Sequence, residues 1–189
     1  MAAAEWHVTP ILGMTFAGQT TLIDPQSAAG KRHVSFGGAA SLLGGGIFGA
    51  EALVIITPGF FQTDRSWLGD DVARVEIKSS RAVAVMGNAV LTTPRRWTEY
   101  SLRPFVSGGF GMLRVSQTPQ VEDRGLPVNA SMAAFNVGGG AIGFLSPRTG
   151  VRFDLRYYGT ARGTDKGPIA FGLVRLHYMT AAVGLVFRR

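Results

Sequence analysis

The sequence predicts an all-β chain that closes into a barrel of eight antiparallel, up-and-down strands. Apolar and polar residues alternate along eight stretches of about ten residues. The connections between these stretches alternate between long and short. No stretch carries a sustained helical period, and the 26 glycines would weaken any helix. We therefore interpret residues 1–189 as a single barrel domain.

Each predicted strand sets an apolar face against a small or polar one. In chain order, the strands are expected near residues 5–18, 33–43, 47–61, 81–92, 101–115, 131–145, 150–159 and 173–187. Their apolar faces include, in the same order, Trp6, Val34, Phe48, Val83, Leu102, Phe135, Phe153 and Met179. The opposite faces include Glu5, Ser35, Glu51, Asn88, Arg103, Asn136, Asp154 and Thr180. This period of two is typical of strands with one face in each of two environments.

The connections predict how the strands are arranged. Long polar connections follow the odd strands, at roughly residues 19–32, 62–80, 116–130 and 159–172. Shorter ones follow the even strands: "GGG", "TPRRWTEY" and "SPRTG". Long loops are therefore expected at one end and short turns at the other. A lone sheet would leave two exposed edges, so we expect it to close.

The faces of the strands indicate that this barrel lies in a membrane. Eight strands enclose an interior that is just wide enough for side chains. Bulky apolar sets would overfill it, whereas Gly, Ser, Thr and Asn fit. The apolar faces then look outward, which water does not tolerate and a bilayer requires. Ten residues tilted near 40° span about 25 Å, the height of a lipid-facing band.

Aromatic residues near the strand ends support the same interpretation. The predicted interfacial girdles comprise Trp6, Phe16, Phe48, Phe60, Trp97, Tyr100 and Phe187.

The inward faces predict a charge network in the lumen. The stretch "VRFDLRYY" points Arg152, Asp154 and Arg156 inward. Glu51 is their expected partner, because the third and seventh strands lie opposite each other in a ring of eight. Two arginines and two acids cancel, so we expect a structural plug, with a gate or ion path as the alternative. The remaining predicted polar lining is His33, Asn88, Asn136, Tyr158 and Tyr178.

Composition excludes several other classes of protein. Charged residues make up 16% of the chain, against roughly 25% in soluble domains. The net charge of +7 comes from scattered basic residues, which does not favour nucleic acid. The absence of cysteine excludes disulfides and thiolate zinc sites. "MAAAEW" is no signal peptide, so we expect either a cytoplasmic chain or a mature form with an added Met.

Enzymatic and metal chemistry find little support. Some barrels of this size act on lipid A through an outward His-x-Ser with a nearby Glu, and His33 and Ser35 match that spacing. A turn centred on Gly45 would pair Ser35 with about Ile55, which leaves Glu51 about 13 Å away. The three histidines, His7, His33 and His177, lack ligand spacing. We expect no catalytic residues, no metal and no cofactor.

One predicted loop carries a candidate surface for contacts. The stretch "TDRSWLGDDVARVEIK" mixes acids and bases with Trp67 and Leu68, and Asp70 and Asp71 follow them. We expect this hairpin to extend beyond the membrane, as a contact site or as solvated decoration.

Four stretches resemble the small eight-stranded outer-membrane barrels of diderm bacteria, the OmpA/OmpX-like superfamily. They are "RPFVSGGFG", "FNVGGGAIGFLSPRTG", "VRFDLRYYG" and "VGLVF". The resemblance implies a mature outer-membrane protein with its short turns in the periplasm and its long loops outside the cell. Members usually end on an aromatic residue that the assembly machinery reads, whereas here Arg188 and Arg189 follow Phe187.

These observations predict a non-enzymatic outer-membrane barrel with a structural or surface-contact role. The alternatives are a narrow passive channel, a lipid-modifying enzyme, and a soluble barrel of lipocalin type. The expected partners are membrane lipid and a surface partner at the long loops, and we expect a monomer.

Overall fold

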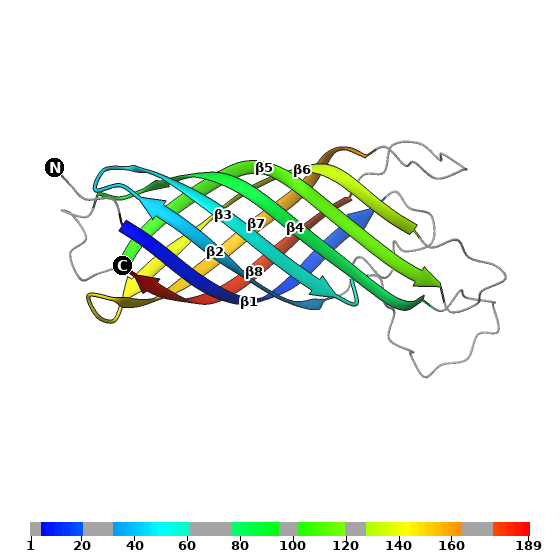
Figure 1. Cartoon of the computed structure of the whole chain (residues 1–189), viewed down its shortest axis with the longest axis horizontal. Helices are drawn as coiled ribbons and strands as arrows, with labels where there is room; N and C mark the ends of the chain where they lie inside the picture. The colour runs from blue at the N-terminus through cyan, green and yellow to red at the C-terminus, as the bar shows by residue number, and fades with distance from the viewer. Residues whose placement is uncertain (1–4, 21–31, 61–76, 95–101, 120–127, 164–175) are drawn as a thin grey trace.

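The computed structural model describes residues 5–20, 32–60, 77–94, 102–119, 128–163 and 176–189. Its strands are β1 (Glu5–Thr20), β2 (His33–Leu43), β3 (Phe48–Pro58), β4 (Ile77–Thr92), β5 (Leu102–Pro119), β6 (Val128–Phe144), β7 (Thr149–Gly163) and β8 (Leu176–Arg188). Each strand pairs antiparallel with the next, and β1 pairs with β8, so the sheet is a closed barrel (Figure 1). In the described ranges, no helix is long and apolar enough to cross a membrane.

The two ends of the barrel differ in what they join. Residues 44–47 and 145–148 connect β2 to β3 and β6 to β7 at the end where β1 begins and β8 finishes. We call this the turn end; it lies on the left in Figure 1. The opposite end, which we call the loop end, is where β1, β3, β5 and β7 finish. The hairpin predicted to extend beyond the membrane lies largely outside the described residues.

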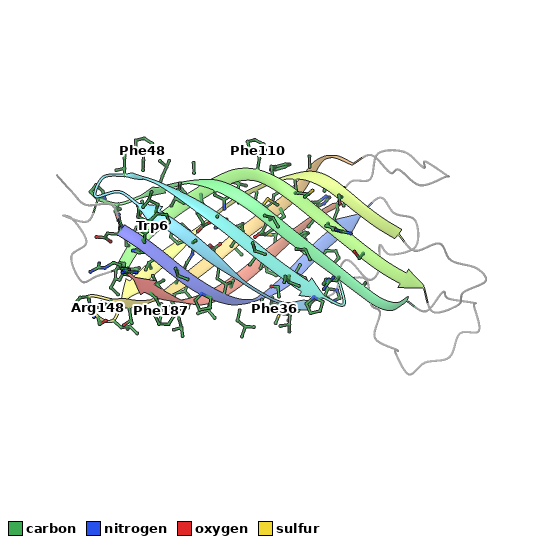
Figure 2. All side chains as sticks on the ribbon, in the orientation of Figure 1. Trp6, Phe36, Phe48, Phe110, Arg148 and Phe187 are labelled. Carbon is green, nitrogen blue, oxygen red and sulfur yellow. The ribbon has the colours of Figure 1, made fainter. Side chains whose placement is uncertain are left out.

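The outward face of the barrel is apolar and its inward face carries the charges. On β7, Phe153 is 58% exposed and Leu155 49%, whereas Arg152 is 3% exposed. The same alternation repeats around the barrel. Phe48, Phe110 and other labelled aromatics project away from the ribbon in Figure 2. The predicted inversion of polarity is thus the polarity of the fold, which excludes the polar exterior of a soluble lipocalin-type barrel.

The outward apolar residues form a band of membrane height. On β5 they run from Leu102 to Met112, and the next outward residue is the exposed Arg114. At about 2.5 Å of height per tilted residue, this stretch spans about 25 Å. Two aromatics, Trp6 and Phe48, lie at the turn-end edge of the band, where an interfacial girdle belongs.

One described residue of the predicted girdle departs from the prediction. Phe60 is fully buried instead of facing lipid, and its ring lies 5.2 Å from that of Tyr178. It follows the last residue of β3 closely enough to fold back over the lumen. Trp97 and Tyr100 lie outside the described residues.

The lumen holds more apolar material than the sequence predicts. Toward the loop end, a buried cluster includes Leu53, Ile55, Phe60, Met86, Leu113, Met132 and Leu176. Toward the turn end, a smaller one comprises Leu43, Val90, Phe105, Ile142 and Val186. The prediction of small and polar residues throughout the interior is therefore wrong at both ends. It holds in the middle, where glycines face the lumen and leave room for long charged side chains.

Candidate functional site

The residues of the predicted charge network meet at one level of the lumen. Register places Glu51 of β3 opposite Asn88 of β4. Asn88 in turn pairs with Gly109 of β5, and Gly109 pairs with Asn136 of β6. The charged residues of β7 lie next to the β6 end of this row and face Glu51 from across the barrel, because β7 pairs with β6 and not with β3.

Ion pairs join β7 to Glu51 across the lumen. Arg152 Nη1 lies 2.5 Å from Glu51 Oε2, and its Nη2 lies 2.6 Å from Asp154 Oδ2. Arg156 Nη2 lies 3.1 Å from Glu51 Oε1 and 2.9 Å from Asp154 Oδ2. Each arginine therefore contacts both acids, and the four formal charges cancel.

Two asparagines, which are neutral side chains, complete the network through hydrogen bonds. Asn88 Nδ2 donates to Glu51 Oε1 at 2.9 Å, and Asn136 Nδ2 donates to Asn88 Oδ1 at 2.7 Å. Arg156 Nη1 donates to Asn136 Oδ1 at 3.2 Å. The path from Glu51 through Asn88, Asn136 and Arg156 returns to Glu51 and closes. We call these two asparagines and the four charged residues the lumen ring.

Gly109 makes the asparagine contact geometrically feasible. The bond between Asn88 and Asn136 passes over β5, whose residue at that level is Gly109. A Cβ added there would overlap Asn88 Oδ1 and the carbonyl oxygen of Gly87. Gly109 and Gly111 of "SGGFG" are thus needed for close approach of neighbouring groups rather than for a turn.

The lumen ring is largely buried and electrically balanced. The Glu51 side chain is 0% exposed and that of Arg156 2%. Burying charges is strongly unfavourable unless they are paired and hydrogen-bonded; all four charges here are paired, although Arg152 Nε is buried without a hydrogen-bond partner. The Arg152 guanidinium also lies over the Phe105 ring, 4.4 Å from its centroid, where a cation is favoured. Removal of one member would leave a buried charge without its partner.

The other predicted lining residues form an aromatic group toward the loop end. Tyr158 and Tyr178 stack with centroids 4.9 Å apart and planes 17° from parallel. His33 is 5.8 Å from Phe60, which in turn packs edge-on against Tyr178. Of the five predicted lining residues, the structure brings only Asn88 and Asn136 into the lumen ring.

A second charged group lies at the turn end, and sequence reasoning did not connect its members. Glu5 Oε2 lies 3.5 Å from His7 Nε2, 3.7 Å from an Arg188 nitrogen and 4.0 Å from an Arg103 nitrogen. Arg103 also donates to the carbonyl oxygens of Thr93 and Gly44. We call Glu5, His7, Arg103 and Arg188 the turn-end cluster. The alternation of the sequence could have indicated this cluster, because Glu5, His7 and Arg103 all occupy inward-facing positions of their strands.

The lipid A enzyme motif does not assemble. The predicted pairing of Ser35 with Ile55 is wrong, because Ile55 pairs with Gly37 and Glu51 pairs with Ser41. Six residues separate Ser35 from Ser41, about 20 Å along the strand. Ser35 is also buried on the inward face, away from lipid. In the described ranges, no three His, Asp or Glu side chains gather as metal ligands would.

The candidate contact residues Trp67, Leu68, Asp70 and Asp71 lie outside the described residues, so their role stays a prediction.

Comparison with solved structures identifies the class of fold. No family model and no curated protein sequence matches the chain. The fold is that of the eight-stranded outer-membrane β-barrels. A major outer membrane protein from Thermus thermophilus superposes with a TM-score of 0.61 at 11% identity, over 99% of this chain and 100% of that one.

Two further barrels show the same likeness. Neisserial surface protein A has a TM-score of 0.60 at 11% identity, covering 96% of this chain and 97% of its own. The attachment invasion locus protein of Yersinia pestis, Ail, has a TM-score of 0.54 at 12% identity, with 100% of both chains covered. Identities this low carry the fold and not the role.

Proposed function

We propose that this chain is a sealed, non-enzymatic outer-membrane barrel with a structural role in the envelope or a surface-contact role through its loops. The observation that carries the proposal is the lumen ring. Its side chains reach from β3 to β7 across the barrel and are almost fully buried. A water-filled path would leave lumen side chains exposed at every level, and at this level they are not.

Apolar clusters on both sides of the lumen ring support the same proposal. The group toward the loop end includes the fully buried rings of Phe60 and Tyr178. The group toward the turn end includes Leu43 and Val186. A passive channel would need an opening through all three levels, so we place it second to a sealed barrel.

Conductance across a planar bilayer tests the sealed lumen. We expect the refolded wild-type barrel to give no stepwise current above the lipid baseline. A heat-dependent mobility shift on a denaturing gel serves as the folding control for each sample. Steady wild-type current that rises in Glu51→Gln or Arg156→Gln would favour the channel and overturn the sealed barrel.

The surface-contact part of the proposal rests on the loops. The fold neighbours include a surface protein and an attachment protein, by their own names. We propose that Trp67 and Leu68 form an apolar contact at the loop end. Cells carrying the wild-type chain should autoaggregate or adhere to polystyrene more than cells carrying a Trp67→Ala, Leu68→Ala double variant. Trp97→Ala serves as the matched control, and equal adhesion of all three would contradict the contact.

A further inference from the structure

The outer surface has a groove at the turn end, on the seam where β1 and β8 close the barrel. It has a volume of about 570 Å³ and is lined by Trp6, Val8, Phe187, Arg188 and Arg189. Register sets Val8 opposite Phe187. One step closer to the end, Trp6 and Arg189 exchange backbone hydrogen bonds of 3.3 and 3.0 Å. An apolar pair is therefore followed by an aromatic and cationic pair.

The side chains of Arg188 and Arg189 point to opposite faces of the barrel wall. Arg188 turns toward the lumen, where it reaches Glu5 and lies over the Phe144 ring at 5.2 Å. Arg189 has outward parity and is exposed. Its neighbourhood gains a second cation from Arg148, whose carbonyl oxygen accepts from the backbone N–H of Arg188 at 2.8 Å. Figure 2 shows Arg148 and Phe187 at the same end of the barrel.

The charged side chains around the groove are all arginines. The acids that the structure describes, Glu5, Glu51 and Asp154, all point into the lumen. The outer groove thus combines an apolar wall, an interfacial Trp and guanidinium groups, with no described acid facing it. Such a surface complements a lipid whose apolar acyl chain lies toward the bilayer centre and whose anionic headgroup lies toward the turn end.

We propose that this groove binds an anionic phospholipid of the leaflet at the turn end. The acyl chain lies against Val8 and Phe187, and the headgroup phosphate accepts hydrogen bonds from Arg189, with Trp6 at the level of the glycerol. This site rests on the membrane placement given under Proposed function.

Tryptophan quenching by brominated lipids tests the site. In a Trp67→Phe, Trp97→Phe background, Trp6 is the sole reporter of the three tryptophans. The refolded barrel is placed in phosphatidylcholine vesicles that contain the same low mole fraction of either dibromo-phosphatidylglycerol or dibromo-phosphatidylcholine. We expect the dibromo-phosphatidylglycerol to be enriched about five-fold at Trp6 relative to the dibromo-phosphatidylcholine, which is the effect of one arginine near an anionic headgroup. Arg189→Gln should abolish the excess, and Arg189→Lys should keep most of it.

Control variants separate this site from its premise. Arg114→Gln, at the loop-end edge of the band, should leave the excess quenching unchanged, and a heat-dependent gel shift verifies that each variant is folded. Equal quenching by both lipids, or an excess that survives Arg189→Gln, would overturn the lipid site while leaving the membrane barrel in place. Absence of quenching by either lipid would overturn the membrane placement and the site together.

Discussion

The lumen ring and the turn-end cluster are both inward-facing charged groups, yet they are built differently. In the lumen ring the contacts of Arg152 with Glu51 and Asp154 are 2.5 and 2.6 Å, and the two acids balance two arginines. In the turn-end cluster one acid, Glu5, faces Arg103 and Arg188 at 4.0 and 3.7 Å. The first is closed on itself, whereas the second has longer contacts, and among the described residues its two arginines outnumber its one acid.

The difference shows that the position of a charged group along the barrel determines how completely its charges must be paired. Mid-barrel charges lie far from water on both sides, so only complete pairing makes their burial tolerable. At the turn end, partial exposure of Arg188 lets solvent screen the excess charge. We therefore expect the lumen ring to be sensitive to single changes and the turn-end cluster to tolerate them.

The largest expected effect is loss of the shared acid in the lumen ring. Glu51→Ala leaves Asp154 as the one acid of the lumen ring for Arg152 and Arg156, so the free energy of unfolding should fall by about 3–5 kcal/mol. Urea titration of the barrel in detergent micelles, followed by tryptophan fluorescence, measures it. Glu51→Gln, which keeps an acceptor oxygen, should lose less. A loss below about 1 kcal/mol for Glu51→Ala would mean that the lumen ring stabilises the barrel no more than an exposed ion pair does, which would contradict the account.

A smaller effect is expected from filling the space that Gly109 leaves. Gly109→Ala puts a methyl group against Asn88 Oδ1 and should disrupt the bond from Asn136. The same titration should show a loss of about 1–3 kcal/mol, the usual range for overpacking. Gly87→Ala is the matched control: its added Cβ would lie 3.9 Å from the nearest atom, and its stability should change by less than about 0.5 kcal/mol. Equal losses for the two variants would remove the packing argument.

The smallest expected effect belongs to the turn-end cluster. Glu5→Ala removes contacts of 3.5 to 4.0 Å and should lower the free energy of unfolding by about 1 kcal/mol or less. High salt should shrink the part of this loss that comes from Arg188, because Arg188 is the partly exposed member of the cluster. If Glu5→Ala were as damaging as Glu51→Ala, the contrast between the two groups would fail.

The sequence was enough to predict the charged residues in the middle of the lumen but not the side chains that fill its two ends. Alternation in "VRFDLRYY" was enough to predict which residues of β7 face inward, and strand order was enough to place Glu51 opposite them. The hydrogen bond between Asn136 and Asn88 could not be predicted, because it forms only where Gly109, which has no side chain, lies between them. That contact depends on exact register, and the predicted pairing of β2 with β3 was off by two residues.

The apolar content of the lumen was missed for a different reason. The volume argument treated the interior as uniform along its axis, whereas long charged side chains fill the middle and apolar ones fill the rest. Residues such as Leu53 and Ile55 share their parity with Glu51 and signalled this directly. Phe60 carried no such signal, since it lies just beyond β3, where alternation ends.

Spin labelling tests most directly the claim that lipid covers the outward apolar face. The chain contains no cysteine, so single cysteines at Phe153 and Leu155 on β7 and at Val183 and Leu185 on β8 can each carry a nitroxide. In vesicles we predict mobile labels that collide with oxygen and are shielded from a water-soluble nickel chelate. Labels immobilised as in a packed core, or freely reached by the chelate, would contradict the account.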